Sequence, residues 1–95
     1  MAWTRATQVA RGEGVVQGAV DGVLVVMQPA TGEYSGLEGT AARIWQLLAE
    51  PTTFGELVDQ LAAEYDVSRG VCAPDVAEWL EQVRRQELVR VLTRT

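Results

Sequence analysis

The fold of this chain is decided by the stretch VVQGAVDGVLVVM, residues 15–27. Two valine-rich runs flank the pair Asp21-Gly22, which supplies the two positive-φ positions of a type I′ turn. The sequence therefore predicts a tight β-hairpin with strands over residues 15–20 and 23–27. The second run is apolar at every position, which is typical of a strand covered on both faces. We expect it to be the central strand of a sheet.

A third strand is predicted after a longer turn. Pro29 and Gly32 favour that turn, because proline fixes φ and glycine accepts a strained backbone. The strand that follows reads Glu33-Tyr34-Ser35-Gly36-Leu37. We expect residues 32–37 to form an edge of the sheet.

Two amphipathic helices are predicted next. Ala41, Ile44, Trp45 and Leu48 recur at the spacing of one helical face, and Pro51 ends that pattern. Thr53 and Glu56 fit a capping box, in which the threonine accepts from a free backbone N–H and the glutamate reaches back to the cap. The apolar stripe of this second helix is predicted at Phe54, Leu57, Val58, Leu61 and Tyr65.

A third helix is predicted to start at Pro74 and Asp75, after a turn over residues 66–72 with Gly70 as its hinge. Its apolar positions are Val76, Ala77, Leu80, Val83 and Leu88. Residues 89–92 fit either a short strand or an extended tail. Residues 1–14 show no sustained periodicity and are predicted to be loose. Trp3 there either folds back onto the domain or marks a contact surface.

Length and composition limit the classes of protein that fit. Ninety-five residues, 47% of them apolar, are enough for a single domain over residues 1–95. The net charge of -5 repels phosphate backbones, so nucleic acid is not an expected partner. No run resembles a signal peptide or reaches the roughly 18 apolar residues of a spanning helix. We expect a cytoplasmic protein with no membrane partner.

Catalytic side chains are scarce. The chain has no histidine and no lysine, so the commonest general base and metal ligand is missing. Cys72 is the only cysteine and has no imidazole to activate it, so we interpret it as a small apolar core residue. No metal-ligand spacing or phosphate-binding loop is present. The sequence predicts a protein that is not an enzyme and uses no cofactor or metal.

Half of the arginines lie near the C-terminus, at Arg84, Arg85, Arg90 and Arg94. One interpretation is a solvated helix end whose cations complement the helix dipole. The other is a basic patch for an acidic partner segment.

The element order predicts an α+β fold that is winged helix-turn-helix-like: a three-stranded antiparallel sheet followed by a three-helix bundle. Within that order, four segments resemble the PqqD-like proteins, which recognise peptides in the biosynthesis of ribosomally made, modified peptides. The segments are DGVLVV (21–26), TGEYSGL (31–37), TAARIWQLL (40–48) and TFGELV (53–58). The resemblance spans about residues 14 to 89. It is greatest to the stand-alone partner protein of lasso-peptide biosynthesis.

The resemblance implies that a precursor's leader peptide adds a strand to the third strand, lies against the third helix and is handed to a separate leader peptidase. The sheet edge would come from Glu33, Tyr34, Ser35, Gly36 and Leu37. The groove wall would come from Asp75, Val76, Trp79, Leu80 and Val83. Core packing is the competing role for Leu80 and Val83, while Trp79 and Tyr34 fit either role. The small pair Ser35-Gly36 departs from the bulky residues common in the family's third strand and leaves its register open.

Elementary physics supports such a use and leaves two alternatives. An open edge strand exposes unpaired N–H and C=O groups that an extended peptide can bind, while apolar anchors carry the specificity. A winged-helix nucleic-acid-binding regulator is the first alternative, with the third helix as its reader. Self-association through the third strand is the second, so the chain is expected to be a monomer or a weak dimer.

Overall fold

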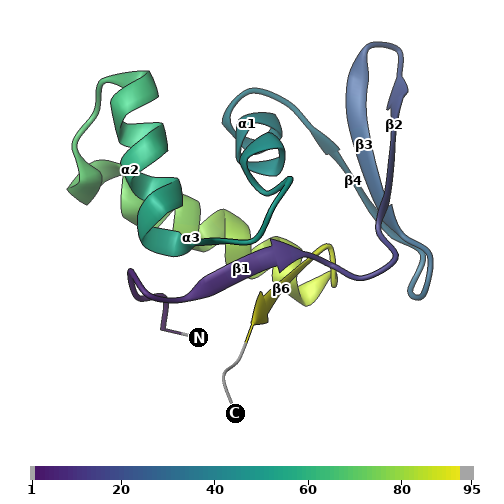
Figure 1. The fold of residues 1–95 in the computed structure, drawn as a ribbon. Helices are drawn as coiled ribbons and strands as arrows, with labels where there is room; N and C mark the ends of the chain where they lie inside the picture. Colours follow the sequence, from purple (N-terminus) through teal and green to yellow (C-terminus); the bar gives the residue numbers. More distant parts are fainter. Residues whose placement is uncertain (1, 93–95) are drawn as a thin grey trace.

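The computed structural model describes residues 2–92, which form two small sheets and three helices (Figure 1). The first sheet has the antiparallel order β2-β3-β4. The second has the order β5-β1-β6. The strands are β1 (Gln8–Arg11), β2 (Val16–Val20), β3 (Val23–Gln28), β4 (Glu33–Leu37), β5 (Thr52–Thr53) and β6 (Val89–Leu92). The helices are α1 (Thr40–Leu47), α2 (Phe54–Tyr65) and α3 (Arg69–Arg85). The α+β prediction is therefore confirmed.

The predicted hairpin is present between β2 and β3. Asp21 and Gly22 have φ of 52° and 80°, and Val20 pairs with Val23 across them. A two-residue turn with both φ values positive matches the right-handed twist of the strands that it joins. β3 lies between β2 and β4, as predicted, and β4 pairs with β3 alone.

The prediction that β3 is covered on both faces is wrong. Val26 is buried against the helices, but the next residue, Met27, is 37% exposed. Val16 and Tyr34 pair with Met27 from either side and are also exposed, so they share its outer face. The three helices stand on one side of the sheet, which leaves this outer face open to solvent (Figure 1).

The prediction of a loose N-terminus is also wrong. β1 lies between β5 and β6 and pairs antiparallel with both. Val9 in β1 is completely buried. A four-residue strand is too short to show periodicity, and its partners come from distant parts of the chain. Of the two alternatives for residues 89–92, a short strand or an extended tail, the structure forms the strand, β6. Trp3 folds back onto the domain, with its ring centroid 5.9 Å from that of Phe54.

The first two helices follow the predicted stripes except at one end. Tyr65, at the end of α2, is 47% exposed, whereas the other predicted stripe residues of α2 are buried. The Thr53 hydroxyl accepts from the Glu56 N–H at 3.1 Å, as predicted. The Glu56 carboxylate does not reach back to the cap; it accepts from the Thr52 hydroxyl at 2.6 Å.

The third helix begins earlier than predicted. Ser68 is its N-cap and accepts from the Val71 N–H at 3.2 Å, so α3 starts at Arg69 and Pro74 lies inside it. Pro74 has no N–H to donate to the carbonyl of Gly70, so α3 lacks one backbone hydrogen bond there, and the Ser68 cap provides a side-chain hydrogen bond at the start of the helix. The preceding turn shrinks to residues 66–68, with Asp66 in the left-handed region at φ 53°. No helix within residues 2–92 has the length and apolar character needed to cross a bilayer.

Gly12 lies directly against the backbone of the segment that follows α3. A Cβ at Gly12 would lie 2.2 Å from the carbonyl oxygen of Glu87. We predict that Gly12→Ala lowers the free energy of unfolding by about 2 kcal/mol, because the backbone must shift. Thermal unfolding should show this as a fall in Tm of roughly 8–16 °C. Gly18→Ala, where a Cβ meets nothing within 4 Å, is the control, and equal Tm values for the two variants would contradict the prediction.

Candidate functional site

The free edge of β4 has a definite hydrogen-bonding pattern. Val20 and Val23 close the two-residue turn and therefore form a hydrogen-bonded pair, and pair types alternate along an antiparallel ladder. Carried through β3 into β4, this alternation directs the backbone groups of Glu33, Ser35 and Leu37 toward β3. The N–H and C=O groups of Tyr34 and Gly36 point away from β3. These four groups are what β4 offers to a further strand.

The side chains of β4 divide between the two faces of the sheet. Leu37 is 2% exposed and belongs to the core, and Ser35 on the same face is half-buried. Tyr34 is 69% exposed on the opposite face. Leu37, whose backbone groups face β3, therefore offers a bound strand neither a free backbone group nor an exposed side chain.

Fewer residues of α3 can form the groove wall than the sequence predicts. Leu80 is completely buried, and Val83 is 3% exposed, so both are core residues with no surface for a peptide. Asp75 is exposed and Trp79 is half-buried. Val76 is buried but lines a cavity together with these two residues. The amphipathic pattern shows the buried face of α3, and only the packing shows which residues lie at its boundary.

That cavity, of about 380 Å³, lies among α1, α2 and α3. Only Glu38 and Gly39 separate the end of β4 from Thr40 at the start of α1, which lines the cavity. The cavity therefore begins two residues beyond the end of β4 along the chain. Its lining is mostly apolar and comprises Thr40, Ala41, Ile44, Leu61, Tyr65, Val67, Val71, Cys72, Asp75, Val76 and Trp79.

The sequence did not identify several of these lining residues as part of a site. Tyr65, Val67 and Val71 are each more than two-fifths exposed around the cavity. A signal was available, because Val67 and Val71 are large apolar residues within a segment predicted to be a turn. Tyr65 was predicted as part of the apolar stripe of the second helix, so its exposed position at the rim of the cavity was not predicted.

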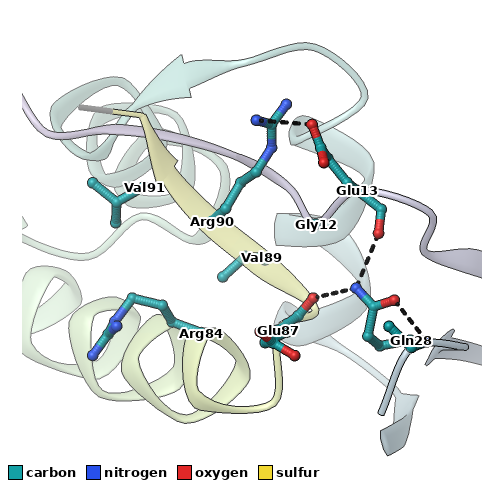
Figure 2. Close-up of a pocket in the computed structure, with 9 residues that line it drawn as sticks. Gly12, Glu13, Gln28, Arg84, Glu87, Val89, Arg90 and Val91 are labelled. Carbon is teal, nitrogen blue, oxygen red and sulfur yellow. Dashed lines mark hydrogen bonds and ion pairs between the residues drawn. The ribbon is translucent and has the colours of Figure 1, made fainter. Parts of the chain in front are cut away.

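A larger cavity, of about 660 Å³, lies near the other end of α3 (Figure 2). Its lining includes the apolar residues Ala30, Val89 and Val91, but it also has four charged residues, Glu13, Arg84, Glu87 and Arg90, whereas Asp75 is the one charged residue in the lining of the smaller cavity. None of the predicted site residues lines it. We assign the candidate site to the smaller cavity, because apolar side chains provide most of the free energy of peptide anchoring.

The clustered arginines have acidic neighbours. Arg84 and Arg85 lie 2.6 and 3.6 Å from the Glu81 carboxylate, and Arg90 lies 3.8 Å from Glu13. The hydrogen bond from Arg84 lowers the pKa of Glu81 to about 2. These contacts favour a solvated helix end over a basic patch. Arg94 lies outside the described residues.

Cys72 lies in the wall of the cavity and is 9% exposed. Burial, and secondarily the negative charge of Asp75, raises the pKa of its thiol. We predict that a disulfide reagent modifies the folded protein at least about tenfold more slowly than the protein in denaturant, because little thiolate is present or accessible. Equal rates in the two conditions would contradict this role as an inert core residue.

Comparison with known proteins places the chain among small α+β domains with this arrangement of sheet and helices. The family model described as coenzyme PQQ synthesis protein D matches residues 24–89. This match covers more than half of the chain, and the chain therefore belongs to the PqqD family.

Two solved structures are similar to this chain. One is TbiB1 in complex with the TbiA(β) leader peptide, with 32% identity and a TM-score of 0.77 over 90% of this chain and 99% of that one. The other is the PqqD truncation of Methylobacterium extorquens PqqCD, a stand-alone recognition element for ribosomally synthesised and modified peptides. It has 15% identity and a TM-score of 0.74 over 94% of this chain and 95% of that one, so it supports the fold alone. Comparison with curated proteins gave no match.

Proposed function

We propose that this protein binds the leader region of a ribosomally synthesised precursor peptide in the cytoplasm and has no catalytic activity of its own. The leader adds a strand to the free edge of β4 and lies beside α3. The bound leader is presented to a separate leader peptidase in lasso-peptide biosynthesis. The observation that carries the proposal is the open edge of β4, which ends two residues before the start of α1 and the apolar cavity against α3.

The energetics require both parts of this site. Tyr34 and Gly36 offer two donors and two acceptors, and each backbone hydrogen bond contributes only about 0.5–1.5 kcal/mol net. That sum does not offset the cost of ordering an extended peptide. Burial of one large apolar side chain contributes about 1.5–3 kcal/mol more. The cavity beside Trp79 therefore supplies the anchoring that the strand edge lacks.

The similarity to TbiB1 supports this proposal. TbiB1 is described in complex with a leader peptide, and the chain covers nearly all of it. The family match extends from β3 through α3 to the first residue of β6, so it includes both walls of the proposed groove.

The nucleic-acid-binding alternative is not favoured. α3 would be the reading helix of a winged-helix protein, but it carries Asp75, Glu78 and Glu81. These carboxylates, together with a net charge of -5, repel phosphates. Self-association through β4 would use the same edge as the leader. If it occurs, the binding experiment should show a dimer that the leader dissociates.

The direct test is titration of the purified protein with the labelled leader peptide encoded beside its gene. Peptide anisotropy reports binding, and tryptophan emission reports the surroundings of Trp3, Trp45 and Trp79 together, so the Trp79→Ala variant identifies the part that comes from Trp79. Saturable binding, together with faster leader cleavage by the cognate peptidase when this protein is present, supports the proposal. Absence of binding at high micromolar peptide, or strong salt-sensitive binding to DNA instead, overturns it.

A proline placed on the free edge tests the addition of a strand. Gly36→Pro removes an outward-pointing N–H and leaves the β3–β4 ladder intact. We predict that it weakens leader binding by about tenfold, as expected for a lost hydrogen bond and hindered pairing. Anisotropy measures the affinity, and circular dichroism confirms the fold.

Ala19→Pro is the matched control for this variant. By the same alternation, the Ala19 N–H points outward from the opposite edge of the sheet, on β2. The Ala19→Pro variant should bind the leader as the native protein does. Equal losses from Gly36→Pro and Ala19→Pro would mean that the peptide does not pair with β4.

The cavity is tested at Trp79, the half-buried aromatic residue in its wall. We predict that Trp79→Ala weakens leader binding by about tenfold or more, because large aromatic anchors dominate interface energies. Gln82→Ala, an exposed position on the same helix, should leave the affinity unchanged. Isothermal titration of the two variants measures both, and an unchanged affinity for Trp79→Ala would place the anchors elsewhere.

A further inference from the structure

Gln28 is the one buried polar residue among residues 2–92, at 6% exposure. Its side-chain amide lies between the segments of Glu13 and Glu87, which are both distant from Gln28 in the sequence (Figure 2). Nε2 donates to the carbonyl oxygens of Glu13 at 3.0 Å and Glu87 at 2.9 Å. Oε1 accepts from the Ala30 N–H at 3.2 Å. Both nitrogen protons and the oxygen of the amide are thus used.

The position of Gln28 makes these bonds a link between the two walls of the proposed groove. On one side, Gln28 ends β3 and pairs with Glu33, the first residue of β4. On the other side, Glu87 adopts the left-handed conformation, at φ 59°, directly beyond α3. The N–H groups of Glu87 and Leu88 bond to the carbonyls of Arg84 and Val83, the pattern that locks a helix end. The Glu87 carbonyl, which accepts from Gln28, is therefore fixed relative to α3.

The other polar contacts that this sheet makes among residues 2–92 reach α1 and β1 and not the end of α3. The two sheets share no strand pairing among the described residues, so no ladder joins them. Val26 and Leu37 pack into the core, but apolar burial has no preferred direction. Gln17 provides a second polar link, yet it accepts from Trp45 and Arg11, in α1 and β1.

We propose that Gln28 is a positioning residue, which holds the edge of β4 at a fixed spacing from α3 and so keeps the groove ready for an extended peptide. The inference rests on the proposed function. Gln28 itself need not contact the peptide, because it acts through the start of β4 and the end of α3. A pre-set spacing strengthens binding because less ordering remains to be done when the peptide arrives.

The chemistry of the link accounts for glutamine at this position. Two carbonyl oxygens need two donors, and the Ala30 N–H needs an acceptor, so an amide satisfies all three. A glutamate would lose the two donors. A methionine has a similar length and shape but can neither donate nor accept strongly, which makes Gln28→Met the direct test.

Leader affinity is the first measurement, with a fluorescein-labelled leader of the precursor encoded beside the gene as the probe. At a temperature where both proteins are fully folded by circular dichroism, Gln28→Met should bind about tenfold more weakly than the native protein. Gln82→Met on the exposed face of α3 is the matched control and should bind normally. Equal affinity of Gln28→Met and the native protein overturns the proposal.

A distance measurement without peptide separates positioning from simple stabilisation. Spin labels at Val20→Cys and Arg85→Cys, in a Cys72→Ala background, report the spacing between the sheet and the end of α3. The proposal expects a broader or shifted distance distribution when Gln28→Met is added, and an unchanged distribution overturns it. If Gln28→Met does not fold, Gln28→Asn replaces it, because its shorter side chain cannot reach both carbonyls. Lack of leader binding by the native protein would overturn the proposed function. The distance measurement uses no peptide, so it would still test whether Gln28 sets the spacing between the sheet and α3.

Discussion

The sheet β2-β3-β4 is covered by the rest of the protein on one face only, and the arrangement of the site depends on this constraint. Val26 and Leu37 on the inner face are buried, whereas Met27 and Tyr34 on the outer face are not. Because no further strand among residues 2–92 pairs with β4, its edge groups remain available. An open edge beside a helix is a suitable place for an extended peptide, whereas a closed or fully covered sheet would offer none.

The second sheet is what holds the helices in position. β1 pairs with β5 before α2 and with β6 after α3, so it joins segments from the start, middle and end of the chain. Gly12 then brings the N-terminal segment against Glu87, and Gln28 adds the start of β4 to the same junction. Three backbone segments and one side-chain amide therefore meet at one end of α3. The apolar cavity lies toward the other end of that helix.

Local signals predicted much of the first sheet and the apolar faces of the helices. Asp21-Gly22 specifies its turn through backbone conformation alone, and Ile44, Trp45 and Leu48 define one face of α1 by spacing alone. The predictions that were wrong depended on distant partners. Residues 8–11 form a strand because β5 and β6 lie beside them, and Ser68 caps α3 ahead of Pro74, where the sequence predicts the start of the helix.

The candidate site shows the same division. Turn residues and hydrophobic periodicity act over a few neighbouring positions, so they were enough to predict the third strand and a third helix with an apolar face. The folded arrangement was needed to show that Tyr34 and Gly36 offer the free backbone groups, that Leu80 and Val83 are core, and that Val67 and Val71 line the cavity. It alone also revealed the contacts of Gln28, which is a single polar residue with no pattern around it. Exposure and hydrogen-bond partners depend on which segments meet in space, and periodicity along one segment carries no information about that meeting.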